Sequence, residues 1–254
     1  MHGCVPQYDV RNREEKPLRL ASWLETNNAA ASLGQGLVRN MLFCGVLFFD
    51  APLTFQEFIV REDVPLADVF RVVLAFIVGR DDAVLFGAQA VNAYCEPPRM
   101  TGDIDLMSTR ARSLAEDIRA LLAGRFGIAV RVREVAAGEG FRIYQLRKPK
   151  NRHLVDVRQV GALPPARSFE GVQVVAPVEL VALKVQSIAA RKGREKELSD
   201  RLDLHRLLRV FPDLRADDGE VTARLRGLGA ANTTLELWRT LAAERVEPDR
   251  DDEY

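Results

Sequence analysis

The chain of 254 residues has few cysteines and no long hydrophobic run. Its three cysteines, Cys4, Cys44 and Cys95, are odd in number and far apart, which argues against a disulfide scaffold or a zinc cluster. Such sparse cysteine usage fits a reducing cytoplasm. The most apolar segment, residues 41–49, ends at Asp50 and is too short to span a bilayer. We therefore expect a core or interface strand there and no membrane partner.

The chain also lacks an excess of charge of either sign. Lys and Arg together number 36, as do Asp and Glu, so the formal net charge is zero. The field of the whole protein therefore does not indicate nucleic-acid binding, although a local basic patch is compatible with this balance. With 47% apolar and 28% charged residues, the chain is long enough for one large domain or two small ones.

Three segments differ in their patterns. Residues 1–40 show no sustained period, and we expect a flexible arm or a non-native extension, with Met41 as the biological start. Residues 41–175 mix helical and strand patterns and form the expected core, whereas residues 176–254 predict helices only. The expected fold class is α+β, with an α/β-like core followed by a C-terminal helical region.

Hydrophobic periodicity and turn signals place the elements within these segments. The expected helices span residues 66–77, 89–95, 111–126, 177–192, 195–210, 220–228 and 232–244. The expected strands span residues 83–86, 128–135, 141–146 and 153–160, and a further strand carries Asp103 and Asp105.

The most informative stretch is residues 84–106. An apolar strand ends at Gly87-Ala88, which opens a short helix whose free N–H groups suit a phosphate. The next strand carries Asp103 and Asp105, whose i,i+2 spacing projects both carboxylates from one face. Paired carboxylates can hold a metal ion, and a divalent metal beside a phosphate indicates nucleotidyl or phosphoryl transfer.

A third acid, Asp156, lies among β-forming residues in a later strand. If that strand neighbours the one with Asp103 and Asp105, three carboxylates converge and can bind two Mg²⁺ ions. Without metal, the three acids would repel one another and destabilise the fold. The alternative for an isolated Asp-x-Asp is a solvated strand end, which the Gly87-Ala88 turn and the third acid disfavour.

Two neighbouring features have simpler interpretations. Strict alternation places His153 on the strand face opposite Asp156, so we expect a surface or interface residue rather than a base. The basic run at residues 148–152, with Arg142 and Arg147 before it, predicts a hairpin tip. That tip is either simply solvated or in contact with the phosphate backbone of an RNA acceptor.

These residues resemble the polymerase β-type nucleotidyltransferase superfamily and, within it, the AbiEii-like toxins. The resemblance covers about residues 65–212 and rests on the apolar strand, the small-residue turn, the helix and the run from Arg99 to Leu106. It implies the nucleotidyltransferase fold, with a mixed sheet flanked by helices. It further implies that Asp103 and Asp105 are metal ligands and that Asp156 is the third ligand or a general base.

The resemblance also implies nucleotide-binding residues near the acids. Gly87 and Ala88 match the phosphate-loop pair, and Arg99 and Thr101 match the polar residues ahead of the acids. Ala88 stands where the toxins often have Ser or Gly. A contact from this position to phosphate would therefore come from backbone N–H groups rather than from a hydroxyl.

Further matches continue into the helical region. Lys184, Arg191, Asp200 and Asp203 match a Lys, an Arg and an acidic pair of the family. The resemblance implies that Lys184 acts in catalysis and that all four bind the nucleotide or orient the acceptor. The alternatives are a lysine that snorkels from an amphipathic helix and a solvated acidic helix face.

The implied function is Mg²⁺-dependent transfer of a nucleoside monophosphate from NTP to an acceptor hydroxyl. The resemblance to toxins implies an RNA or tRNA end or a protein as acceptor, and a cognate antitoxin as partner. Two alternatives stay open. One is a nucleotidyltransferase-like binding module without catalysis. The other is an aminoglycoside-type enzyme, whose cationic substrate would need an acidic pocket such as Asp200, Asp203, Asp217 and Asp218 could supply.

Overall fold

The structure, a computed structural model, describes residues 64–135 and 138–246. Its helices are α3 (Leu66–Ile77), α4 (Gly87–Tyr94), α5 (Ala111–Phe126), α6 (Pro177–Ala190), α7 (Glu195–Val210), the 3₁₀ helix η2 (Pro212–Arg215), α8 (Glu220–Gly227) and α9 (Asn232–Ala243). Its strands are β1 (Ala83–Phe86), β2 (Ile104–Ser108), β3 (Val130–Val135), β4 (Gly140–Gln145), β5 (Arg152–Gln159), β6 (Ala166–Phe169) and β7 (Val172–Val175). The helices and strands expected from the sequence are confirmed, with ends that move by at most two residues.

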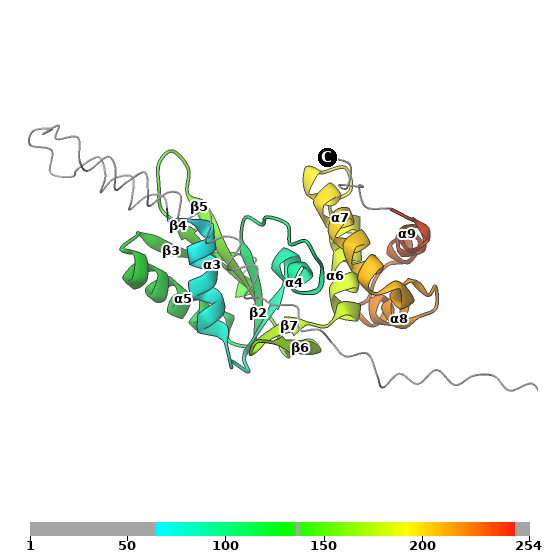
Figure 1. The fold of residues 1–254 in the computed structure, drawn as a ribbon, viewed down its shortest axis with the longest axis horizontal. Helices are drawn as coiled ribbons and strands as arrows, with labels where there is room; N and C mark the ends of the chain where they lie inside the picture. The colour runs from blue at the N-terminus through cyan, green and yellow to red at the C-terminus, as the bar shows by residue number, and fades with distance from the viewer. Residues whose placement is uncertain (1–63, 136–137, 247–254) are drawn as a thin grey trace, which may run out of the picture.

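Among the described residues, seven strands form one mixed sheet in the order β3-β4-β5-β2-β1-β7-β6. β2 is parallel to β5 and β1 is parallel to β7, whereas the other neighbours are antiparallel. Figure 1 shows α6 to α9 gathered beside the sheet, with α4 between them and the strands. The expected α+β class is confirmed. The arm expected at residues 1–40 and the strand expected at 41–49 lie outside the described residues.

The core fills the space between the sheet and its helices. α5 packs against β3, β4 and β5, where Phe141, Ile143, Val155 and Val157 are buried. Each such side chain stabilises the fold by about 1.5–3 kcal/mol relative to an exposed position. No helix in the described part of the chain is both long and apolar enough to cross a membrane.

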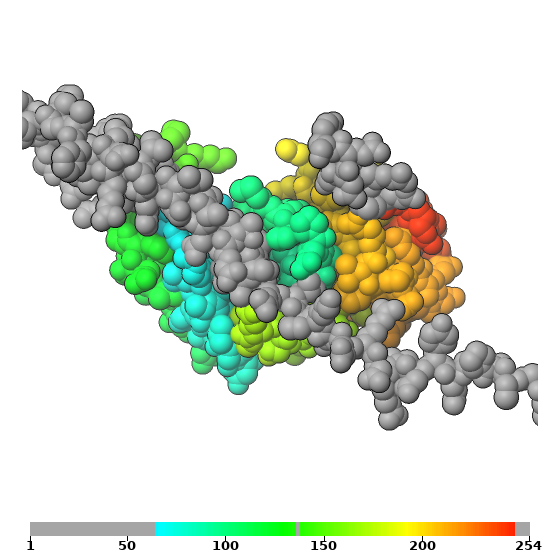
Figure 2. Space-filling model, viewed as in Figure 1, coloured from blue at the N-terminus to red at the C-terminus, as the bar shows by residue number. Residues whose placement is uncertain are grey.

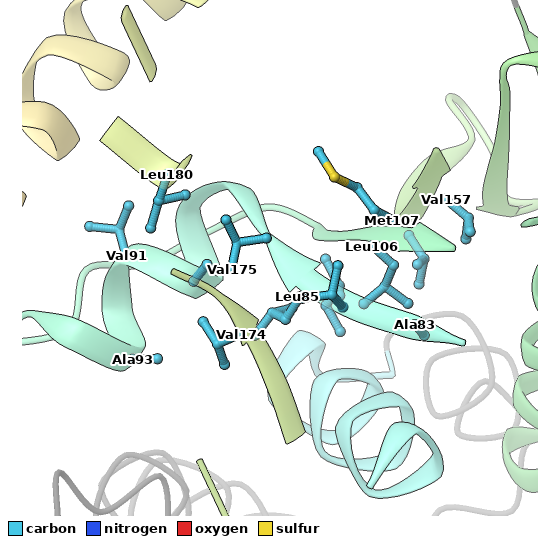
Figure 3. Close-up of a cluster of buried hydrophobic side chains, with 14 of the residues drawn as sticks. Ala83, Leu85, Val91, Ala93, Leu106, Met107, Val157, Val174, Val175 and Leu180 are labelled. Atoms are coloured by element: carbon cyan, nitrogen blue, oxygen red, sulfur yellow. The ribbon is translucent and has the colours of Figure 1, made fainter. Parts of the chain in front are cut away.

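The middle of the sheet has its own apolar cluster. Figure 3 shows Leu85, Leu106 and Val174 on neighbouring strands, with Val91 of α4 and Leu180 of α6 close by. All five side chains are buried. The cluster therefore fixes α4 and α6 beside the strands that carry the predicted site.

The hairpin of β6 and β7 was not expected from the sequence. β6 is exposed along most of its length, so it has no alternation of apolar and polar residues. Its turn is Glu170-Gly171, and both residues have positive φ angles, 49° and 84°, as a two-residue hairpin turn of type I′ requires. β7 then pairs with β1 and leads into α6 at Pro177, which places α6 in contact with α4.

Side chains from α4 and α7 hold the loop that leads into β2. Asn92 exchanges two hydrogen bonds with the backbone of Arg99, at 2.8 and 3.0 Å. Arg206 of α7 donates to the carbonyl oxygens of Cys95, at 3.2 Å, and of Pro97. The first half of the loop is therefore attached to both helices.

A network of buried ion pairs joins α6, α7 and the same loop. Lys184 Nζ donates to Asp200 Oδ1 at 2.9 Å and to Asp203 Oδ2 at 2.7 Å. Arg99 donates to both oxygens of Asp203, at 2.6 and 2.7 Å, and Arg191 donates to Asp200 at 2.6 Å. Because Lys184, Asp200 and Asp203 are all buried, neither a snorkelling lysine nor a solvated acidic face describes them.

We predict that Lys184→Met lowers the free energy of unfolding by about 3 kcal/mol, because it removes a cation shared by two buried carboxylates. Urea titration would measure the change. The matched control is Arg226→Met, which removes the cation of an exposed pair with Asp218 at 3.3 Å and should cost less than about 1 kcal/mol. Equal losses in the two variants would contradict a network that supports the fold.

Candidate functional site

A cavity of about 610 Å³ opens between the start of α4, the strands β2 and β5, and the helices α6 and α7. Ten of the eleven site residues expected from the sequence line it within the described structure. These are Gly87, Ala88, Arg99, Thr101, Asp103, Asp105, Asp156, Lys184, Arg191 and Asp200. The remaining residue, Asp203, is fully buried beneath Arg99 and Lys184. Residues from distant parts of the sequence thus meet at one place.

The register of two parallel strands brings the acids together. Asp105 of β2 lies directly opposite Asp156 of β5, and Asp103 stands two residues before Asp105. Among the described residues, no hydrogen bond reaches the Asp105 carboxylate. Burial, together with the negative charges of Asp103 and Asp156, raises the pKa of Asp105 to about 7. The site therefore concentrates negative charge in a poorly solvated position.

His153 belongs to this site, and the expectation of a surface or interface residue was wrong. Its Nδ1 lies 3.0 Å from Asp103 Oδ2, and this hydrogen bond is the main reason that the pKa of Asp103 is lowered. The pairing of β4 with β5 shifts register here: Ile143 pairs with Val155 but Tyr144 pairs with His153, leaving Leu154 as an extra residue. Such a bulge interrupts the alternation, so His153 shares the cavity with Asp156.

The third acid, Asp156, has a cation as its neighbour. Arg142 lies opposite it on β4, and Arg142 Nε donates to Asp156 Oδ2 at 3.1 Å. Within the described residues, no three Asp, Glu, His or Cys side chains stand as a preformed metal-binding group. The donor chemistry nevertheless suits a hard divalent cation, because Asp105 lies partly buried between two other carboxylates and forms no ion pair with a described residue, although the charges of Lys184 and Arg158 act on it.

Gly87 is required by the position of Asp105. Its φ angle is +70°, and a Cβ built there would lie 2.0 Å from Asp105 Oδ2. Any side chain at this position would therefore force the carboxylate to move. Gly87 and Ala88 also begin α4, so their backbone N–H groups lie at the positive end of a helix that borders the cavity.

Several lining residues were not among the expected site residues. Lys196 and Ser199 come from the first turns of α7, and Ser187 comes from α6. Arg158 of β5 stacks over the ring of Phe86, with its guanidinium 4.9 Å from the ring centroid. A charged, amphipathic helix gives no sequence signal that separates such residues from ordinary surface positions.

Two of the predicted residues, Thr101 and Asp203, form contacts within the protein itself. The Thr101 hydroxyl accepts a hydrogen bond from Gln89 of α4, so this threonine also ties β2's leading loop to α4. Burial opposes ionisation of Asp203, but hydrogen bonds and charge from Arg99 and Lys184 outweigh it and lower its pKa. Asp203 is thus held as a carboxylate.

Solved structures with low sequence identity resemble the chain. They include the Megavirus polyadenylate synthase, with 14% identity and a TM-score of 0.45 over 66% of this chain and 40% of that one. Another is JHP933 from Helicobacter pylori, with 13% identity and a TM-score of 0.46 over 75% and 91% of the two chains. A third is ANT(2″)-Ia in complex with adenylyl-2″-tobramycin, with 13% identity and a TM-score of 0.45 over 64% and 98%.

Other comparisons concern the sequence itself. No curated protein matches the chain. The chain spans 40% of the length of the Megavirus enzyme chain. A family model described as the nucleotidyl transferase AbiEii toxin, of type IV toxin-antitoxin systems, matches residues 71–254. Because this match covers well over half of the chain, the protein belongs to the AbiEii family and is a nucleotidyltransferase.

Proposed function

We propose that this nucleotidyltransferase moves a nucleoside monophosphate from NTP to an acceptor hydroxyl in a Mg²⁺-dependent reaction in the cytoplasm. The observation that supports this most is Asp105, a partly buried and poorly solvated carboxylate between Asp103 and Asp156 at the wall of a cavity. A carboxylate in this position is unfavourable for the empty protein. It becomes favourable when a divalent cation is bound.

The triphosphate lies, in this proposal, between the start of α4 and the helices α6 and α7. Backbone N–H groups at Gly87 and Ala88 face it from one side. Lys184 lines the other side, but Asp200 and Asp203 already balance its charge. Arg191, whose side chain is 41% exposed, and the exposed Lys196 supply further positive charge.

Asp103, Asp105 and Asp156 would hold two Mg²⁺ ions, which would neutralise charge at the reacting phosphate when bound. His153 fixes one oxygen of Asp103 by its hydrogen bond, and Arg142 does the same for Asp156. The acceptor oxygen forms a bond to the α-phosphorus while the bond to pyrophosphate breaks. Asp156, on the cavity wall, is the carboxylate that we assign to receive the hydroxyl proton.

The charges of the cavity favour an anionic acceptor. Among the described residues, six basic and four acidic side chains line it. The acids that could have bound a cationic aminoglycoside are already paired: Asp200 and Asp203 within the buried network, Asp217 with Arg239 and Asp218 with Arg226. We therefore propose that the acceptor is an RNA end, such as that of tRNA, in preference to a protein or a small molecule. In this proposal the enzyme is the toxin of a pair with a cognate antitoxin.

We predict that Asp103→Asn and Asp105→Asn each reduce transfer about 10³-fold, because each removes one charged oxygen ligand worth several kcal/mol in the transition state. Each α-labelled NTP would be incubated with the enzyme, Mg²⁺, cellular RNA and cellular protein, and one gel would show which acceptor is labelled. The control is Asp218→Asn, whose side chain is 80% exposed outside the cavity. Full activity of either cavity variant would refute the metal assignment.

Wild-type protein that labels nothing and gains no thermal stability from NTP with Mg²⁺ would instead indicate a module without catalysis.

We further predict that Asp105→Asn stabilises the protein in the presence of EDTA, although it strongly reduces transfer. Removal of a poorly solvated charge between two like charges should raise the free energy of unfolding by roughly 1–3 kcal/mol. Urea titration at mildly alkaline pH would measure this. Mg²⁺ should stabilise the wild type and not the variant. A variant less stable than wild type under EDTA would show that Asp105 serves the fold.

A third prediction concerns Gly87, which also has a matched control. Gly87→Ala and Gly127→Ala each place alanine at a positive φ angle, +70° and +64°, and this backbone conformation alone should cost about 1–2 kcal/mol in each variant. Only at Gly87 does the new Cβ collide with Asp105, whereas nothing lies within 4 Å at Gly127. Transfer should therefore be lost in Gly87→Ala and kept in Gly127→Ala. Similar activities in the two variants would contradict this role of Gly87.

A further inference from the structure

One face of β3, β4 and β5 carries arginines at alternate positions along the strands. α5 packs against these three strands on the face where Phe141 and Val157 are buried. The opposite face presents Arg131 and Arg133 of β3, Arg142 of β4 and Arg158 of β5, all of them exposed. We call these four residues the arginine face.

The arginine face is poorly explained by the stability of the fold. Arg142 pairs with Asp156, but in the described part of the chain neither Arg131 nor Arg133 forms an ion pair. Arg133 also lies directly opposite Arg142 in the antiparallel register, and like charges in this arrangement are destabilising. Unpaired positive charge on a pleated surface is instead suited to a partner that carries regularly spaced negative charge.

Aromatic groups lie on the same face. Tyr144 is opposite Arg131 in the register, and its ring centroid is 5.1 Å from that of His153. Arg158 stacks over Phe86. Guanidinium planes and aromatic rings beside positive charges are the groups on which the bases of single-stranded nucleic acid stack. A negatively charged protein partner would account for the arginines but not for the aromatic rings.

The arginine face is continuous with the cavity. Arg142 and Arg158 both line the cavity beside Asp156, whereas Arg131 and Arg133 lie on the outermost strand of the sheet. Arg131 and Arg133 are two residues apart on β3, so the points at which their side chains leave the backbone are about 6.6 Å apart. The β4–β5 hairpin tip, with the exposed Lys148 and Lys150, projects from the body near these strands (Figures 1 and 2).

We propose that the arginine face binds the single-stranded end of an RNA acceptor and directs its terminal hydroxyl to the carboxylates. Phosphates contact Arg131 and Arg133 at the outer strand, and the last nucleotides pass Arg142 and Arg158 into the cavity. This inference rests on the proposed function, because it takes the acceptor to be RNA. It adds the path by which that acceptor reaches the site.

The test compares two double variants that lose the same charge. Arg131→Gln with Arg133→Gln removes the outer half of the arginine face. Arg112→Gln with Arg125→Gln removes two exposed arginines of α5, on the other side of the sheet. Fluorescence anisotropy of a short single-stranded RNA with a 5′ fluorescein label would give Kd across a salt titration, without NTP or metal.

The outer variant should bind this RNA about 10-fold more weakly than wild type. The slope of log K against log salt should also fall by about 1.4, at roughly 0.7 for each lost phosphate contact. The α5 variant should match the wild type in both measurements. Equal binding by the two double variants, or no binding of the RNA by the wild type, would overturn the inference.

Transfer assays separate this inference from the proposed function. With labelled NTP and the same RNA, the outer variant should show a raised KM for RNA and an unchanged kcat, because neither arginine touches the carboxylates. A wild type that binds RNA through this face but labels no RNA would overturn the proposed function and leave the binding surface intact. Labelling of protein alone, with equal efficiency in both variants, would overturn the RNA path.

Discussion

The carboxylate of Asp203 is fully buried and is held by two cations from different parts of the fold. Arg99 reaches it from the loop before β2, and Lys184 reaches it from α6. One side chain of α7 therefore joins the sheet to two helices. A buried charge of this kind is tolerated only while its partners remain in place, so the wall of the cavity depends on the whole network.

Asp105 is a partly buried carboxylate in different surroundings. Asp203 faces two cations and has a lowered pKa, whereas Asp105 faces Asp103 and Asp156 and has a pKa raised to about 7. The charges of Lys184 and Arg158 favour the ionised form of Asp105, but burial and the two neighbouring acids outweigh them. Gly87, which leaves room for this carboxylate and for nothing larger, indicates that its position serves the site.

The sequence predicts those features that depend on local spacing. The i,i+2 pair Asp103 and Asp105 and the helices that follow residue 176 are of this kind. His153 was misjudged because an extra residue at Leu154 is a property of strand pairing, which the sequence of one strand does not contain. The burial of Asp200 was missed for a similar reason: the cation that compensates it lies on another helix.

The hairpin of β6 and β7 has no hydrophobic alternation in its exposed first strand, although its Glu170-Gly171 turn could have indicated it. The overall composition likewise does not predict the local electrostatics of the protein. A net charge of zero describes the whole chain, but charges in salt solution act over only about 8–10 Å. Many acids, such as Asp82 between Arg80 and Arg110, are neutralised locally by their own partners. Arg131 and Arg133, which form no ion pair with a described residue, lie together on one edge of the sheet, where their local field can attract an anion despite the overall balance.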